Sequence, residues 1–372
     1  AAPPGAHHVA SGRIAGRLRA HADAWRRCGA STDVMSIIER GYTIPFTCRR
    51  QDVPRYHAHQ NGKGCLEHAE WLRQAIPELL EVGAIEAVPT RPHVVALVNV
   101  LPKSSPGKFR LIVDLRPLNY HVRERPFKYE THATFRDLIE ADDDFISFDF
   151  ASGYYHVDVA PEDRTFLGFR LFGQFYQFAV LPFGLRDACY VFTEVVKVPV
   201  RQLRTSGFRV LAYLDDLLLA LQQMSQRDAN AARAILEQLG FLLNLDKCVM
   251  SPTKRIENLG LVVDSQAMTY ELTAKRLAKF QDAEAALRGA LEADGVVRVR
   301  DVARITGHAA AASIVLERRA RLYTRFLNDA IRDSAAARNW SAVVPLGLGP
   351  LAELAIWREI LGSLGSPCLH HL

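Results

Sequence analysis

Residues 208–221 read FRVLAYLDDLLLAL, two apolar runs interrupted by the adjacent carboxylates Asp215 and Asp216. Short apolar runs of this kind are typical of two buried strands, which would place the aspartates at the turn between them. A plain β-turn also favours aspartate, and this simpler interpretation explains the pattern equally well. Buried unpaired charge is costly, however, and a divalent cation that binds carboxylate oxygens would offset the cost.

A second aspartate ends a second apolar stretch. Residues 144–150 read DFISFDF, a predicted strand with Asp149 near its end. Two strands that each deliver a carboxylate can bring both to one sheet edge. Two-metal phosphoryl transfer needs this arrangement, with two ions about 4 Å apart that act on the attacking hydroxyl and on the leaving group. The neighbouring acidic run, Asp142 to Asp144, predicts a solvated turn instead of further ligands.

Composition is that of a globular chain with a sizeable core. Of 372 residues, 49% are hydrophobic and 23% charged, which predicts two or three domains or subdomains. The net charge of +5 permits nucleic-acid binding without requiring it. The six cysteines have no zinc-site spacing, which favours free thiols and an intracellular location. No apolar run reaches the ~18 residues of a membrane helix, and no signal peptide is expected at the start.

Six segments, taken in order, resemble the reverse transcriptases of retroviruses and long-terminal-repeat retroelements. They are PKSSPGKFRLIVDLRPLN (102–119), FDFASGYYHV (148–157), LPFGLRDACYVF (181–192), YLDD (213–216), LNLDKC (243–248) and ENLGLVV (257–263). One such segment would be weak, but six in the family's order are specific. The wording GYYHV, VLPFGL and ACYVF, with GYTIPF at 41–46, most resembles the DIRS-like group, which integrates with a tyrosine recombinase.

The resemblance implies a catalytic role for the three aspartates. Asp149 and Asp215 would bind two Mg²⁺ ions, which Mn²⁺ could replace, and Asp216 would assist. The fingertip residues Lys103 and Arg110 would bind the incoming triphosphate, for which a compact ammonium and a planar guanidinium are both suited. The simpler interpretation of these two cations is a solvated hairpin.

The resemblance also implies five further contacts to the nucleotide. The backbone of Phe150 would contact a metal or the phosphates, and Tyr154 would be the aromatic gate under the deoxyribose, with Tyr155 as the alternative. Phe183 and Gly184 would lie beside the nucleotide, and Lys247 would act as a general acid toward pyrophosphate. Ordinary sheet packing for Tyr154 and a surface position for Lys247 are the alternatives.

The implied fold is α+β, a right-hand polymerase with fingers, an antiparallel palm sheet and a helical thumb. The expected divisions are an N-terminal extension (1–60), fingers (61–140 and 159–188), palm (141–158 and 189–271), thumb (272–335) and the start of a connection (336–372). The implied activity is RNA-directed DNA polymerase, with template, primer and dNTPs as partners. A catalytically silent relic or a non-catalytic nucleic-acid-binding subunit is the alternative. Fusion to ribonuclease H and a recombinase in a longer polyprotein is also implied.

Overall fold

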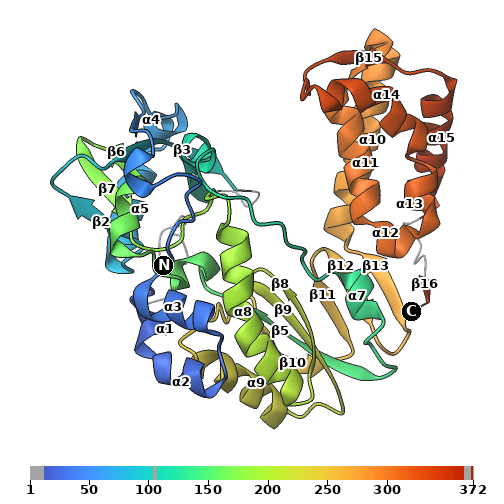
Figure 1. Ribbon diagram of the computed structural model, residues 1–372. Coiled ribbons are helices and arrows are strands. Elements are labelled where there is room, and N and C mark those ends of the chain that lie inside the picture. The colour runs from blue at the N-terminus through green and yellow to red at the C-terminus, as the bar shows by residue number, and fades with distance from the viewer. Residues whose placement is uncertain (1–11, 104–106, 364–369, 372) are drawn as a thin grey trace. The chain divides into compact units, whose positions relative to one another are not determined.

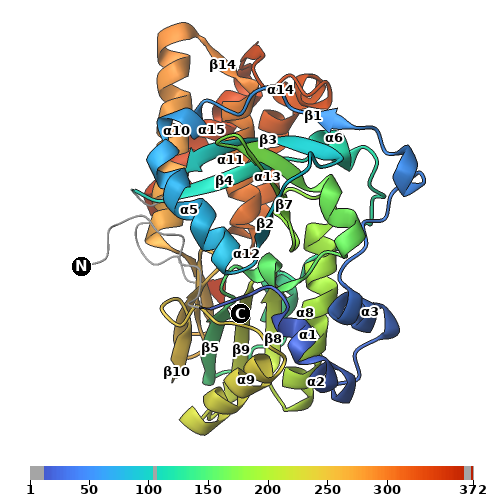
Figure 2. The same ribbon diagram turned by 90° about the vertical axis from the view of Figure 1, so that its left-hand side faces the viewer.

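The computed structural model describes residues 12–103, 107–363 and 370–371. The chain divides into two compact units. Unit 1 consists of Ala1–Thr131 and Ile146–Pro252, and unit 2 of His132–Phe145 and Thr253–Leu372. Both combine helices with mainly antiparallel sheets, which agrees with the predicted α+β class (Figure 1 and Figure 2). No helix in the described ranges is long and apolar enough to cross a membrane.

Unit 1 begins with three short helices, α1 (Arg17–Ala20), α2 (Ala22–Arg27) and α3 (Thr32–Arg40). His21 separates α1 from α2. The indole Nε1 of Trp25 donates to the Leu239 carbonyl at 2.9 Å, and Arg17 Nε donates to the Gly240 carbonyl at 3.0 Å. These bonds join the N-terminal helices to residues 239–240.

A six-stranded sheet of unit 1 carries the predicted fingertip hairpin. Its strand order is β1-β3-β6-β7-β2, with β4 paired to β3. The strands are β1 (Tyr56–His57), β2 (Ile85–Val88), β3 (Val94–Pro102), β4 (Phe109–Asp114), β6 (Gly168–Leu171) and β7 (Gln174–Phe178). The segments that connect or follow these strands contain the helices α4 (Gly64–Glu67), α5 (Ala69–Glu81) and α6 (Arg116–Asn119). Residues 104–106, at the predicted tip of the first hairpin, lie outside the described ranges.

A four-stranded sheet, called here the central sheet, has the order β10-β5-β9-β8. It contains β5 (Asp143–Asp149), β8 (Arg209–Tyr213), β9 (Asp216–Gln222) and β10 (Val249–Thr253). Helix α8 (Ala188–Thr205) packs on β8 and on α9 (Gln226–Gln238), as Figure 1 shows. Ser225 and Asp228 form a capping box that starts α9. The apolar run of β9 is buried, which confirms the strand predicted there.

The acidic run before β5 is not the solvated turn that the sequence predicts. Asp143 is fully buried and begins the strand, and its carboxylate accepts a bond from the Glu140 backbone N–H at 2.8 Å. Asp144 lies 3.1 Å from Lys254 Nζ. Of the three acids only Asp142 is exposed, and the nearby Glu140 N–H and the distant Lys254 compensate for the burial of Asp143 and the partial burial of Asp144.

Unit 2 contains an antiparallel sheet of β11 (Arg255–Asn258), β12 (Leu261–Asp264), β13 (Thr269–Leu272) and β16 (His370–His371). Helix α7 (His132–Arg136) also belongs to this unit. The predicted helical part follows as α10 (Ala274–Asp294), α11 (Val299–Ala311), α12 (Ser313–Leu316), α13 (Arg318–Leu322), α14 (Arg325–Ala336) and α15 (Leu348–Ser363). A short ladder of β14 (Val296–Arg298) and β15 (Val343–Pro345) interrupts it.

Four of these helices form a bundle around a second core. Figure 1 shows α10, α11, α14 and α15 side by side, and Phe280, Val302 and Trp357 are buried among them. The buried carboxylate of Glu353 accepts the Phe326 and Leu327 N–H groups at 2.9 and 2.8 Å. Glu353 thus caps α14 and has a structural role. The finer subdomain boundaries given above stay predictions.

Candidate active site

The three predicted aspartates meet at one edge of the central sheet. Asp149 is the last residue of β5, and the β8–β9 hairpin pairs Tyr213 with Asp216 across a two-residue turn. The backbone N–H of Phe150 donates to the Asp215 carbonyl at 3.0 Å. This bond joins the end of β5 directly to the turn, so folding brings together carboxylates that lie 66 positions apart in the chain.

The turn itself is strained. Leu214, its first central residue, has φ of 55°, a value that glycine normally supplies in tight hairpins. A non-glycine residue in such a conformation costs roughly 1–3 kcal/mol and persists only where its surroundings fix it. Here the strands on both sides are buried and paired, and Leu214 packs partly against the core. Strain of this kind is commonly found at functional sites.

Burial and neighbouring negative charge raise the pKa values of the two aspartates in the turn, Asp215 and Asp216. Burial, followed by the charge of Asp149, raises the pKa of Asp215 above its ordinary value. The pKa of Asp216 rises to about 6, first through burial and then through the charges of Asp215 and Asp149. Lys247 opposes this effect, because its Nζ lies 3.2 Å from both carboxylate oxygens of Asp149.

A loop that follows α9 holds Lys247 in place. The Ala151 N–H donates to the Leu242 carbonyl at 2.9 Å, and the Asn244 N–H donates to the Asp149 carbonyl at 2.8 Å. The loop therefore continues along the end of β5. The Lys247 side chain is 64% exposed, so a substrate can reach the ammonium.

The carboxylates of this site are suited to bind a divalent cation whose other ligands would be water and oxygens of the substrate. The charge of Asp149 contributes to the raised pKa values of Asp215 and Asp216, and Lys247 hydrogen-bonds to Asp149. Those described residues hold no group of three or more His, Cys, Asp or Glu side chains placed to enclose a metal ion by themselves. Mg²⁺ commonly takes only one or two carboxylates and completes its shell with water and phosphate oxygens.

The hairpin cations face the same site. Lys103 directly follows β3, and its backbone N–H donates to the Lys108 carbonyl at 2.7 Å. Arg110 is in β4, where it pairs with Leu101 of β3. The pKa of Lys103 is lowered by burial, then by the charges of Arg110, Lys108 and Lys247. Arg110 also acts on the pKa of Asp215. Lys103, Arg110 and Lys247 come from three segments and are close enough to act on one another or on Asp215, and this concentration of positive charge is suited to a polyphosphate.

Tyr154 lies in a short 3₁₀ helix, Gly153–His156, directly after β5. Its ring is 7% exposed and contacts those of Phe183 and Phe192, with centroids 4.7 and 5.2 Å away. Gly153 allows the backbone before Tyr154 to pass close to Asp215. A Cβ at this position would lie only 3.1 Å from the Asp215 Cβ, which is too close for an ordinary contact. Phe183 is 48% exposed, which leaves its ring accessible beside Tyr154.

Gly184 has φ of 95° in the loop before α8, a conformation that disfavours any side chain. Two residues that the sequence did not single out support this region. The Asn119 side-chain amide donates to the Gly184 carbonyl at 2.8 Å and accepts the Arg186 N–H at 2.9 Å. Asp187, at the start of α8, is buried and accepts the hydroxyl of Tyr42 from the N-terminal segment.

His156 is a third residue that sequence reasoning missed. The Leu242 N–H donates to its Nε2 at 2.9 Å, so Nδ1 carries the proton and donates to the Gly153 carbonyl at 3.0 Å. Burial lowers its pKa to about 4, which keeps the ring neutral. The histidine connects the turn that holds Tyr154 to the loop that holds Lys247. Its position one residue after two tyrosines gave no signal of this role.

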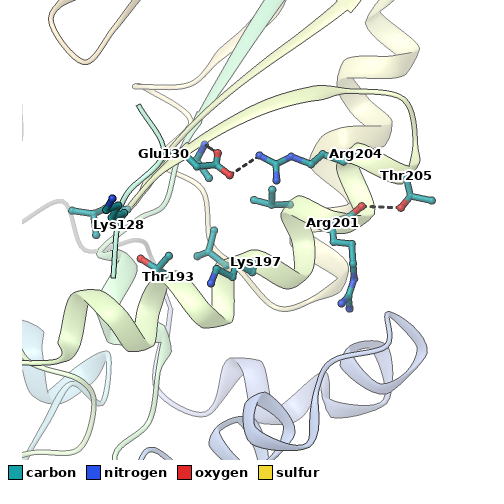
Figure 3. Close-up of a pocket in the computed structure, with 11 residues that line it drawn as sticks. Lys128, Glu130, Thr193, Lys197, Arg201, Arg204 and Thr205 are labelled. Atoms are coloured by element: carbon teal, nitrogen blue, oxygen red, sulfur yellow. Dashed lines mark hydrogen bonds and ion pairs between the residues drawn. The ribbon is translucent and has the colours of Figure 1, made fainter. Parts of the chain in front are cut away.

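A hollow of about 620 Å³ lies behind the strained turn, between α8 and residues 128–130, with Leu214 in its lining (Figure 3). Glu130 accepts bonds from the Ala212 N–H at 2.9 Å and from Arg204 at 2.7 Å, and Figure 3 shows Arg204 pointing toward it. The extended segment that contains Tyr129 is thereby attached to β8.

Comparisons with known proteins agree with this geometry. Residues 101–263 match the family model described as "Reverse transcriptase (RNA-dependent DNA polymerase)". The genome polyprotein of Petunia vein clearing virus is 24% identical over 295 residues, which is 78% of this chain and 13% of that polyprotein. The enzymatic polyprotein of Cauliflower mosaic virus is 27% identical over 51% of this chain and 28% of its own length. The Pol polyprotein of the Drosophila melanogaster transposon gypsy is 25% identical over 52% of this chain and 19% of its own.

Solved structures share the fold. The foamy viral protease–reverse transcriptase in complex with double-stranded DNA has a TM-score of 0.65 at 14% identity, covering 94% of this chain and 60% of that one. The same kind of protein in complex with an RNA/DNA hybrid has a TM-score of 0.60 at 15% identity, covering 94% and 46%. The α+β class and the right-hand polymerase fold are therefore confirmed, whereas the DIRS-like subgroup stays a prediction. The chain spans 13–28% of the length of these curated relatives, and its residues 101–263 match the reverse transcriptase family model.

Proposed function

We propose that this chain is an RNA-directed DNA polymerase that extends a primer on an RNA or DNA template. The observation that carries the proposal is the meeting of Asp149 with the Asp215–Asp216 turn through the Phe150–Asp215 backbone bond of 3.0 Å. Burial, and then repulsion between the carboxylates, raises the pKa values of Asp215 and Asp216, so the site gains from a bound cation. Two Mg²⁺ ions, or Mn²⁺ in their place, would activate the primer hydroxyl and stabilise the leaving pyrophosphate.

Each of the surrounding residues has a role in this proposal. Asp149 and Asp215 hold the ions, Asp216 assists, and the Phe150 carbonyl can contact an ion or a phosphate, since its N–H is already bonded. The triphosphate binds to Lys103 and Arg110, whose neighbouring charges include Lys247.

Lys247 changes partner when substrate binds in this proposal. Its ammonium is held on Asp149 in the structure and is largely exposed. Cations bound by that carboxylate would release the ammonium to donate its proton toward pyrophosphate. Tyr154, Phe183 and Gly184 form the side of the site where the sugar and base would lie.

Template and primer are the proposed macromolecular partners. The relatives are polyproteins several times longer than the aligned segment, so we also propose that this chain is normally joined to further enzymes such as ribonuclease H and a recombinase.

Primer extension on poly(rA)/oligo(dT) with Mg²⁺ and dTTP tests the proposal. Asp149→Asn and Asp215→Asn should each reduce extension by at least about a thousandfold, because a lost metal ligand costs several kcal/mol in the transition state. Asp137→Asn is a matched control, since that side chain is 73% exposed and bonds only to Arg136 among described residues. A wild-type protein that binds template–primer without extending it would favour the non-catalytic alternative.

A further inference from the structure

The thiol of Cys189 hydrogen-bonds to a tyrosine hydroxyl beside the candidate active site. Cys189 lies in the first turn of α8, and its Sγ is 2.9 Å from the Tyr154 hydroxyl. Tyr129, from the opposite segment, is close enough to the same thiol for it to raise the Tyr129 pKa, after burial. Burial is the largest cause that raises the pKa of both tyrosines, so their hydroxyls keep their protons and can donate to the sulfur.

The backbone that carries this thiol is fixed. The Thr193 hydroxyl, one turn further along α8, donates to the Cys189 carbonyl at 2.8 Å. On the other side, Glu130 bonds to the Ala212 N–H and fixes the segment next to Tyr129. The thiol is therefore an anchor for Tyr154 on a helix whose backbone is held in place.

This anchor restrains the part of Tyr154 that packing leaves free. Phe183 and Phe192 contact its ring, but Phe183 is half exposed and can yield. The hydroxyl bond to Cys189 holds the far end of the ring and so fixes its tilt. Exclusion of a ribose hydroxyl by close packing is sensitive to displacements well below 1 Å.

A ring contact extends the network to the catalytic turn. The Tyr129 ring lies 4.9 Å from the ring of Tyr213, the residue before the strained Leu214. One thiol thus connects the residue that would select the sugar with the hairpin that carries two catalytic aspartates.

We infer that Cys189 is a positioning residue for sugar selection, which fixes Tyr154 through its hydroxyl and connects it, through Tyr129, to the Tyr213 side of the catalytic hairpin. This inference rests on the proposed polymerase function, and it assigns a specificity role to a cysteine outside the metal-binding and phosphate-binding residues. The alternative is that Cys189 only fills space in the core.

The ratio of kcat/KM for dTTP to that for UTP, measured on one primed template, tests the inference. Cys189→Ala removes the hydrogen-bond partner, and we expect the ratio to fall about fivefold to tenfold, the rate equivalent of one lost hydrogen bond. Cys189→Ser keeps a partner for both hydroxyls and should retain most of the selectivity. Cys65→Ala is the matched control, a buried thiol that bonds to the Val98 carbonyl and should leave the ratio unchanged.

A double-mutant cycle separates positioning from packing. Tyr154→Phe removes the hydroxyl and keeps the ring, so adding Cys189→Ala to it should lower the ratio little further. An unchanged ratio in Cys189→Ala, or equal effects of this substitution in both backgrounds, would overturn the inference even if the variant melts earlier. A wild-type protein without primer extension would instead contradict the proposed function, and the inference with it.

Discussion

Asp216→Asn should stabilise the metal-free protein while it impairs polymerase activity. The wild-type carboxyl is held near two other aspartates in a largely buried turn, and its pKa is raised to about 6 by burial, then by Asp215 and Asp149. Folding at neutral pH must therefore bury an ionised carboxylate in surroundings that disfavour its charge. Asparagine has the same shape and carries no charge, so the variant avoids this cost.

The magnitude follows from the pKa difference. A rise from 3.8 to about 6 corresponds to about 3 kcal/mol, at about 1.4 kcal/mol for each pH unit. The carboxyl is not wholly removed from water, so solvent screening reduces the effect, and we expect about 1–2 kcal/mol. For a protein of this size, such a change raises the melting temperature by roughly 1–3 °C.

The sign of the pH dependence is also fixed. Below about pH 4 the Asp216 carboxyl is protonated in both the folded and the unfolded protein, and the two proteins should melt at similar temperatures. As the pH rises through about 6, the wild type loses stability that the variant keeps, so the difference opens and then levels off.

Thermal melting in EDTA between pH 4 and pH 8 measures this difference, with and without added Mg²⁺. Asp114→Asn is the control of opposite sign, because a hydrogen bond from Arg116 holds the pKa of Asp114 below its ordinary value and its loss should destabilise. Mg²⁺ should narrow the gap by stabilising the wild type more than the variant. A variant of Asp216 that melts at or below the wild-type temperature at pH 7 in EDTA would refute the reasoning.

Three further outcomes are expected. Lys103→Ala or Arg110→Ala should raise the KM for dNTP or lower kcat about tenfold with little change in duplex affinity, measured by steady-state kinetics and by fluorescence anisotropy; a fall in duplex affinity alone would indicate a template clamp. Tyr154→Val should relax the dTTP-over-UTP preference at least tenfold while DNA synthesis persists, and an unchanged preference would transfer the gate to Tyr155. These 372 residues should not cleave the RNA strand of an RNA–DNA hybrid. Metal-dependent cleavage that survives Asp149→Asn in a gel assay would reveal a nuclease site separate from the polymerase site.

Local sequence patterns determined the strands, the hairpins and the candidate catalytic aspartates. Apolar runs of four to eight residues can only be buried strands or short buried helix segments, and the turn residues between them decide the choice. The aspartates are conspicuous because they interrupt such runs. Lys103, Arg110 and Tyr154 could likewise be proposed from the order of the segments, and their roles stay predictions.

Tertiary structure alone decided which distant groups became partners. The sequence gives no sign that Lys247 reaches Asp149, that Cys189 lies between Tyr129 and Tyr154, or that Asp143 is buried. The contacts of Lys247 and Cys189 join segments that are separated by tens of residues. The burial of Asp143 likewise depends on how the rest of the chain packs around it. Side-chain hydrogen bonds and pKa values depend on distances of a few ångströms, and only the packing of the sheet, helices and loops against one another sets those distances.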